Sequence, residues 1–168
     1  LEPAQNAIQA ALTGHLVFST LHTNDAASAI TRLVDLGAQH FLLASTLTGL
    51  VAQRLVRKVC EKCATERRLT ASEVAELQVE IPERNPVIKQ GAGCIDCRHT
   101  GYRGRTAIYE MFEINEAVRR LIMERAGTSE IKHQAQRDGM LTLRQAAVQK
   151  MLQGVTSFEE VLAVTVAG

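Results

Sequence analysis

Four cysteines form the pattern in this sequence that points most directly to chemistry. They occur as two C-x-x-C pairs, Cys60 with Cys63 and Cys94 with Cys97, and they are all 4 cysteines of the chain. Together the pairs supply the soft, tetrahedral set of thiolates that Zn²⁺ prefers. A metal shell filled by thiolates keeps no open position for catalysis. The sequence therefore predicts a structural zinc site held by these cysteines.

Two other uses of the cysteines compete with zinc. The gap between the pairs is roughly thirty residues, longer than the range of about 15–20 that is typical of a compact zinc ribbon. Disulfides are disfavoured because no signal peptide leads the chain and we expect a reducing compartment. A thioredoxin-like redox site would normally use a single C-x-x-C beside a βαβ pattern. We therefore favour a closed zinc site over both alternatives.

Two histidines are the second candidate for chemistry. His15 precedes and His22 follows the run Leu16–Leu21, whose apolar and β-branched residues predict a buried strand. Asn24-Asp25 stands where the N-cap of a following helix should be. In open α/β sheets, ligands bind outside the carboxyl ends of the strands. The polar residues that begin at His22 are therefore a candidate ligand site.

The segments around the histidines predict alternating helices and strands. Rough alternation of residue types predicts a strand over residues 51–59, and apolar residues at helical spacing predict helices over 4–12, 25–36 and 41–50. The order of these elements is helix, strand, helix, helix, strand. This order suits an α/β layer, in which crossover connections favour a parallel sheet.

The character of the sequence changes after residue 59. Thr70–Leu77 is expected to be a short helix, in which Thr70 and Glu73 form a capping box. A turn-rich loop over 99–105 and a strand over 106–114 follow the second cysteine pair. The remainder predicts short amphipathic helices, which begin after caps at Asn115, Thr128, Thr142 and Thr156. Such a tail is a packing module that shows no chemistry of its own.

The composition excludes several classes of protein. The chain has 168 residues, 46% of them hydrophobic and 22% charged, which suits one ordinary domain or two small ones. A formal net charge of +1 and an aromatic content of 4% argue against nucleic-acid binding, including a nucleic-acid-binding zinc ribbon. No apolar run approaches the length of a membrane span. We therefore expect a globular protein that binds no nucleic acid.

Several ordered motifs resemble those of one known family. Thr13–Asn24 resembles the histidine box of the bacterial secretion ATPases, the motors of type II secretion and type IV pilus assembly. Gln53–Arg57 resembles the segment before the family's four-cysteine zinc element. Gly93–Glu110 matches its signature G-C-x-x-C-x-x-T-G-Y-x-G-R-x-x-I-Y-E, and residues 140–144 and 154–165 resemble its C-terminal helices. The cysteine pairs favour the assembly and secretion branch over the related retraction motors, which generally lack them.

The resemblance implies a fold and a division of the chain. The fold would be α/β, the C-terminal part of a RecA-like P-loop ATPase domain with a zinc-binding four-cysteine insertion and a C-terminal helical subdomain. Residues 1–59 would be the C-terminal half of the ATPase core, which carries the histidine box. Residues 60–105 would be the zinc element, and residues 106–168 a strand followed by the helical subdomain.

The nucleotide-binding motifs of the family are absent from this sequence. A P-loop needs the pattern G-x-x-x-x-G-K-[ST], and none of the 11 glycines is followed by lysine. The Walker B and aspartate boxes, which lie upstream in the family, are missing as well. The chain therefore resembles the part of the motor that begins just after Walker B, and we expect this fragment alone to be inactive as an ATPase.

The resemblance also implies roles for individual residues in the parent ATPase, which would use ATP and Mg²⁺. His22 would approach the nucleotide phosphates and sense their state. His15 is the other catalytic candidate, or else it only orients the turn before the expected strand. Thr23, Arg54 and Arg57 are candidates for nucleotide binding, although the two arginines would serve equally as a solvated face of a strand.

For the parent, the resemblance implies a homohexamer on the cytoplasmic face of the inner membrane. Its ATP hydrolysis would drive the assembly of pilin-like subunits, and inner-membrane secretion or pilus platform proteins would hold it peripherally at the membrane. A hypothesis of a different class is a zinc-stabilised interaction module that binds partner proteins and no nucleotide. The polar cluster at the end of the expected strand favours the motor, since a pure adaptor does not need it.

Overall fold

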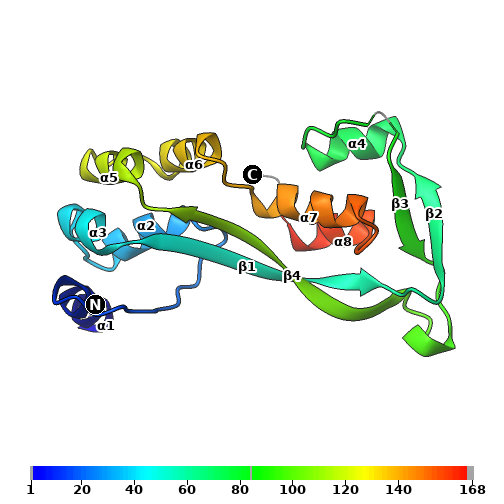
Figure 1. Ribbon diagram of the computed structural model, residues 1–168, viewed down its shortest axis with the longest axis horizontal. Coiled ribbons are helices and arrows are strands. Elements are labelled where there is room, and N and C mark those ends of the chain that lie inside the picture. Colours follow the sequence, from blue (N-terminus) through cyan, green and yellow to red (C-terminus); the bar gives the residue numbers. More distant parts are fainter. Residues whose placement is uncertain (1, 84, 166–168) are drawn as a thin grey trace. The chain divides into compact units, whose positions relative to one another are not determined.

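The computed structural model describes residues 2–83 and 85–165 (Figure 1). Its residues form two compact units. The helical unit consists of the residues up to Ala52 together with Glu110–Met140, and the cysteine unit of Gln53–Tyr109 together with the residues from Leu141 onward. Among the residues described, no helix combines the length and apolar character that a membrane span requires.

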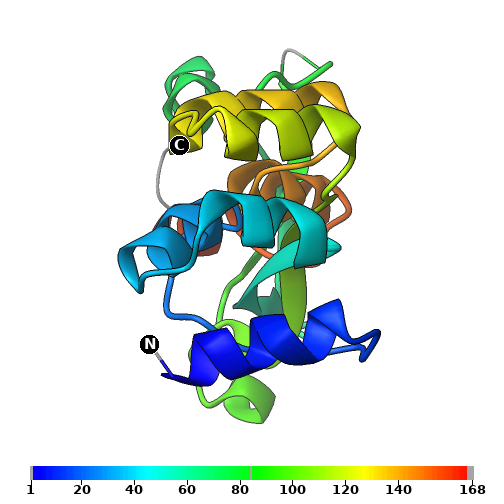
Figure 2. The same cartoon turned by 90° about the vertical axis from the view of Figure 1, so that its left-hand side faces the viewer.

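The helical unit is a layer of short helices around an apolar core. The helix α3 packs against α1 and α5, and α6 packs against α5 and α2. Figure 2 shows α5 and α6 side by side. The buried side chains between them include Ile30, Leu43, Val118, Ile122 and Ile131. The helices of this unit are α1 (Glu2–Leu12), α2 (Ser28–Asp35), α3 (His40–Thr46), α5 (Glu116–Met123) and α6 (Thr128–Arg137).

The cysteine unit combines a small antiparallel sheet with helices. In this sheet β2 (Ala64–Arg68) pairs with β3 (Val87–Gly91), so that Ala64 lies opposite Gly91. The helix α7 packs against β3 and α8. The other elements are α4 (Ala71–Leu77), the short 3-10 helix η1 (Ile95–Cys97), α7 (Leu143–Leu152) and α8 (Phe158–Val164).

The long strands β1 (Gly49–Val59) and β4 (Tyr102–Glu113) form the second sheet, and each contributes residues to both units. The Ile114 amide donates to the Thr48 carbonyl at 2.9 Å, and the Cys60 amide donates to the Gly101 carbonyl at 2.9 Å. Residues early in one strand therefore face residues late in the other, and the pair is antiparallel.

The predicted parallel sheet is therefore wrong for the described residues. That prediction needed two strands, 16–21 and 51–59, joined by a helical crossover. The first of them does not form, so no strand remains that a crossover could bring parallel to β1.

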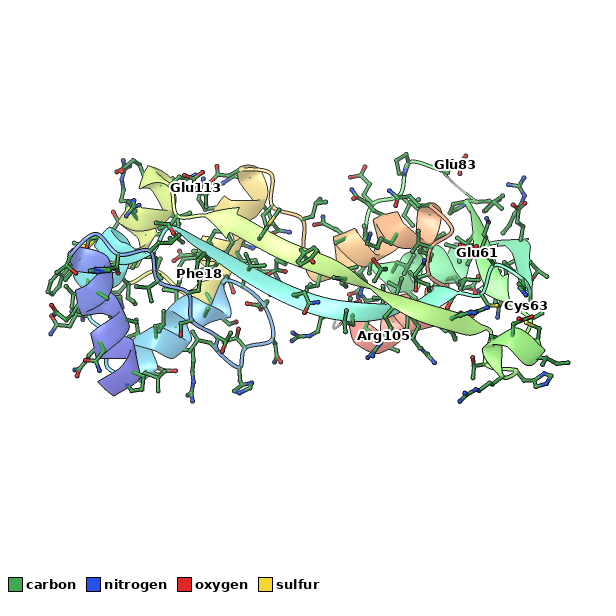
Figure 3. All side chains as sticks on the ribbon, turned by 60° about the horizontal axis from the view of Figure 1, so that its bottom comes forward. Phe18, Glu61, Cys63, Glu83, Arg105 and Glu113 are labelled. Carbon is green, nitrogen blue, oxygen red and sulfur yellow. The ribbon has the colours of Figure 1, made fainter. Side chains whose placement is uncertain are left out.

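The segment Leu16–Leu21 is the largest departure from the sequence-based expectation. It has no strand assignment, and its side chains are not buried: Leu16 is 75% and Phe18 is 88% exposed (Figure 3). The sheets formed by the described residues contain only the pairs β1–β4 and β2–β3. An apolar, β-branched sequence forms a strand only where a neighbouring strand accepts its backbone hydrogen bonds.

Helix caps that depend on local side chains agree with the prediction. Thr70 and Glu73 form the expected capping box of α4, in which Thr70 Oγ1 accepts a hydrogen bond from the Glu73 amide. The Asn115 side chain accepts from the Val118 amide at the start of α5, and Thr142 caps α7. These caps need only residues that are close in sequence.

Two predicted caps are wrong by one residue. The first helical residue of α6 is Thr128, and its N-cap is Gly127. Ser157 caps α8 by accepting from the Glu160 amide, because the hydroxyl of Thr156 instead donates to the distant carbonyl of Arg57 at 2.8 Å. A tertiary contact therefore changes the capping residue, whereas α8 itself spans the expected residues Phe158–Val164.

Several element boundaries differ as well. The third helix ends at Thr46 rather than near residue 50, and α2 begins at Ser28 rather than at residue 25. The strand β4 begins at Tyr102 instead of residue 106, and β2 and β3 were not predicted. The predicted segments 1–59, 60–105 and 106–168 do not coincide with the two compact units, and as functional divisions they stay a prediction.

Candidate functional site

The four cysteines converge on one point of the cysteine unit. Their sulfur atoms all lie within 4.8 Å of one another. The Sγ–Sγ distances are 4.0 Å for Cys60 and Cys94, 3.8 Å for Cys63 and Cys97, and 3.7 Å for Cys94 and Cys97. A disulfide would need about 2.05 Å, whereas a tetrahedron with Zn–S bonds of about 2.3 Å has edges of about 3.8 Å. The cluster therefore has the dimensions of a tetrahedral thiolate site that could bind a metal ion.

The backbone positions these sulfurs with two short turns. Cys60 follows β1 and Cys63 precedes β2, and the Cys63 amide donates to the Cys60 carbonyl at 3.2 Å (Figure 3). Cys94 is the N-cap of η1, and Cys97 is the last residue of this short helix. Two separate stretches of chain thus each present a pair of sulfurs.

A glycine pair allows these stretches to approach each other closely. A Cβ atom built on Gly91 would lie only 2.0 Å from the carbonyl oxygen of Gly101, and Gly101 itself has a φ of +78°. Because any side chain at Gly91 would meet backbone, glycine is required where β3 passes the start of β4.

Backbone amides point at the sulfurs. The Gly93 amide donates to Cys63 Sγ at 3.3 Å, and Cys97 Sγ accepts from the Cys94 amide at 3.1 Å and the Gly101 amide at 3.3 Å. Such donors stabilise thiolates and orient metal ligands.

The pKa values of the thiols follow from burial and these donors. Burial raises the pKa of Cys97, but the two amide donors and the hydrogen bonds with the Cys94 and Cys63 thiols together lower it to about 6. Burial raises the pKa of Cys63 to about 12, helped by the neighbouring sulfurs and opposed by the Gly93 amide. Sulfurs this close resist ionising together, and a bound dication would remove that repulsion. The donor set therefore fits a soft divalent metal.

The two histidines lie at opposite ends of the exposed segment between α1 and α2. His15 Nδ1 is 3.1 Å from Thr13 Oγ1 and 3.3 Å from the Ala10 carbonyl, at the C-terminal end of α1. It therefore supports the turn at Gly14, whose φ is +90°. His22 is exposed, and the hydroxyl of Thr23 beside it donates to the Asp25 carbonyl at 3.0 Å.

The two candidate arginines belong to the cysteine unit rather than the helical unit. Arg57 donates from its backbone N and its Nε to the buried carboxylate of Glu160, and its guanidinium lies 4.1 Å from the ring centroid of Tyr102. The hydrogen bond to Glu160 raises the pKa of Arg57. Arg54 donates to the Gln53 carbonyl at 3.0 Å. The structure thus gives Arg57 an internal partner for its charge.

Sequence reasoning missed two buried carboxylates. Glu110 is 1% exposed, and its Oε1 accepts a hydrogen bond from the Ala26 amide at 2.8 Å. Glu160 is also buried and receives Arg57. The available signal for Glu110 was its alternation with the buried Ile108 on β4, which places a charged residue at an inward position.

A family comparison covers nearly the whole chain. The model of the family described as Type II/IV secretion system protein matches residues 1–163. The chain is 48% identical over 165 residues to type II secretion system protein E of Aeromonas hydrophila, which covers 98% of this chain and 32% of that protein. It is also 47% identical over 173 residues to the type IV pilus assembly ATPase PilB of Thermus thermophilus, which covers 98% of this chain and 19% of that protein.

A third relative and a solved structure agree with these matches. The type IV pilus assembly ATPase TfpB of Acinetobacter baylyi is 46% identical over 167 residues, 97% of this chain and 28% of that protein. The crystal structure of the pilus retraction motor PilT with bound ADP matches with a TM-score of 0.64 and 25% identity, covering 99% of this chain and 37% of that chain. The α/β fold is therefore similar to that of PilT. The chain spans less than a third of the length of these curated relatives. Because the family model matches residues 1–163, the chain belongs to the family of type II/IV secretion system proteins.

Proposed function

We propose that this chain is the C-terminal part of a hexameric ATPase that powers type II secretion or type IV pilus assembly. The observation that carries the proposal is the match of residues 1–163 to the family, because relatives with 46% and 47% identity are named pilus-assembly ATPases. The alternative, an interaction module without nucleotide chemistry, does not explain this match along the full chain.

In this proposal the helical unit contributes to a RecA-like ATPase core. The exposed apolar residues Leu16 and Phe18 support it, because they suit a strand whose neighbours lie in another part of the parent protein. The P-loop that holds the phosphates and Mg²⁺ would lie in that part too, since this sequence lacks the G-x-x-x-x-G-K-[ST] pattern. The chain alone is then expected to have no ATPase activity.

Within the core, His22 is the residue that acts on the nucleotide. It is exposed, so its ring is accessible to a phosphate, whereas His15 is engaged at the end of α1. Thr23 and Arg54 remain candidates for nucleotide contacts. For Arg57 such a contact competes with Glu160, so a structural role is favoured.

The cysteine cluster would hold one Zn²⁺ through Cys60, Cys63, Cys94 and Cys97. The spacing of the sulfurs and the amide donors to them support this assignment. With all ligands from protein, the ion would supply folding energy and join the two cysteine turns rather than take part in a reaction.

The proposed setting is the cytoplasmic face of the inner membrane. There the hexamer would associate peripherally through inner-membrane platform proteins and use ATP hydrolysis to drive the assembly of pilin-like subunits. This setting follows the family resemblance and the names of the relatives.

A comparison of ATPase activity tests the proposal. Steady-state hydrolysis is measured for the full-length parent protein and for this chain, each purified in the same way. We expect Mg²⁺-dependent turnover by the parent and none by the chain. Turnover by the isolated chain that survives further purification would place nucleotide chemistry here, and absence of turnover by an intact hexameric parent would contradict the motor.

A further inference from the structure

A buried carboxylate of β4 contacts the backbone that follows the histidine segment. Glu110 Oε1 accepts a hydrogen bond from the Ala26 amide at 2.8 Å, although 84 residues separate the two in sequence. Both residues belong to the helical unit, and both side chains are buried. This hydrogen bond connects the end of β4 to the start of α2.

The same short stretch is held by two further hydrogen bonds. Asp25 Oδ1 accepts from the Ser28 amide at 2.8 Å, and Thr23 Oγ1 donates to the Asp25 carbonyl at 3.0 Å. The N-cap residue Ala27 has no side-chain cap of its own. The amides at the start of α2 thus have side-chain acceptors: Asp25 for Ser28, the first residue of the helix, and Glu110 for Ala26 just before it. Together with the hydrogen bond from Thr23, they fix the backbone back to the residue beside His22.

A role in packing alone does not explain a carboxylate at this position. A buried charge is expensive unless hydrogen bonds compensate it, and an apolar side chain would fill the space at a lower cost. Glu110 is also too enclosed, at 1% exposure, to meet a nucleotide itself. Its side chain is long enough to place a carboxylate oxygen within hydrogen-bond distance of the Ala26 amide.

We propose that Glu110 is a positioning residue for His22. By fixing the Ala26 amide, it holds the backbone from His22 to α2 in the arrangement that directs the imidazole toward the nucleotide. This inference rests on the proposed role of His22 in turnover. A displacement of about 1 Å in a reacting group can lower a rate by about 10²-fold. Loss of the hydrogen bond between Glu110 and the Ala26 amide would therefore be enough to lower turnover if it shifts His22.

Two substitutions of Glu110 separate the effect of its side-chain length from the effect of its charge. Glu110→Gln removes the charge and keeps an oxygen at the same distance along the side chain. Glu110→Asp keeps the charge but is one methylene shorter, which withdraws the acceptor from the Ala26 amide. Asn115→Ala is the matched control, because it removes another side-chain cap of the helical unit, at the start of α5.

The test uses these variants in the full-length parent protein, with three measurements on each. Steady-state kinetics give kcat, titration with a nucleotide analogue gives Kd, and hydrogen exchange follows the amides of residues 22–28. For Glu110→Asp we expect kcat to fall about 10- to 100-fold, an unchanged Kd and faster exchange of this stretch. Glu110→Gln should retain kcat within about threefold, and Asn115→Ala should leave kcat and the exchange of 22–28 unchanged.

The outcomes separate this inference from the proposed function. If the wild-type parent does not hydrolyse ATP, the motor itself is wrong. If it does, and Glu110→Asp keeps full kcat or loses no more than Asn115→Ala, Glu110 does not position His22. If Glu110→Gln loses as much kcat as Glu110→Asp, the charge rather than the reach matters, which also overturns the inference.

Discussion

The carboxylate of Glu160 binds Arg57 at two points. It accepts from the Arg57 backbone amide at 2.8 Å and from the Arg57 Nε at 2.7 Å. The Glu160 side chain is only 4% exposed, whereas that of Arg57 is 51% exposed. One buried acid of α8 therefore satisfies both the backbone and the side chain of a β1 residue, and it joins these two elements of the cysteine unit.

Replacing Glu160 should destabilise the cysteine unit. Glu160→Ala leaves the Arg57 amide without its acceptor and removes a charge-assisted hydrogen bond, so we expect a loss of about 1.5–3 kcal/mol in the free energy of unfolding. Urea unfolding followed by circular dichroism measures it. The control Arg103→Ala breaks an exposed ion pair with Asp96 and should change stability by less than about 1 kcal/mol. If both variants lose the same free energy of unfolding, the buried Glu160 contact stabilises the protein no more than an exposed ion pair does.

The cysteine cluster predicts one zinc ion per chain. Elemental analysis of metal-replete protein should give a stoichiometry near one, and Cys94→Ser should reduce it because a thiolate is lost from the tetrahedral shell. Hydrogen exchange should then increase between Ala64 and Gly93, while the helical unit keeps its protection. Lys62→Ala, which removes only an exposed ion pair with Asp96, is the control and should keep the metal. A well-folded wild-type sample without zinc contradicts the site.

The capping box of α4 predicts a dependence of stability on pH. The hydrogen bond from Arg67 and the amide of Thr70 lower the pKa of Glu73 below its ordinary value. A carboxylate with a lowered folded-state pKa contributes stability above its unfolded pKa of about 4.3 and loses that contribution as the pH falls through the folded value. The free energy of unfolding should therefore differ less between pH 7 and pH 3 in Glu73→Gln than in the wild-type protein. The matched control is Glu116→Gln, because Glu116 is largely exposed. A stability difference that does not change in Glu73→Gln would rule out this contribution.

The agreement between sequence and structure depends on how local each feature is. The caps at Thr70, Asn115 and Thr142 need residues within one helical turn, so sequence reasoning finds them. The four cysteines carry their chemistry in their spacing, although only the fold brings the two pairs together.

Features that depend on distant residues were missed or misjudged. The Leu16–Leu21 segment has the composition of a strand but no neighbouring strand among the described residues. The strand β2 is polar, A-T-E-R-R, and forms because β3 pairs with it. Glu110 finds its partner 84 residues away. The composition of a segment indicates its strand propensity, but a strand forms only where a neighbouring strand pairs with that segment.

The most direct test of the account is the effect of His22→Ala on the full-length parent, measured by steady-state ATPase assays beside nucleotide-binding titrations. A donor directed at the γ-phosphate acts on charge that shifts during transfer, so turnover should fall by about 10²-fold. Nucleotide affinity should change little, because the P-loop supplies most of it. His15→Ala is the control and should have the smaller effect, since His15 supports the end of α1. Unchanged turnover in His22→Ala, or a larger loss in His15→Ala, would contradict the assignment of the histidine segment.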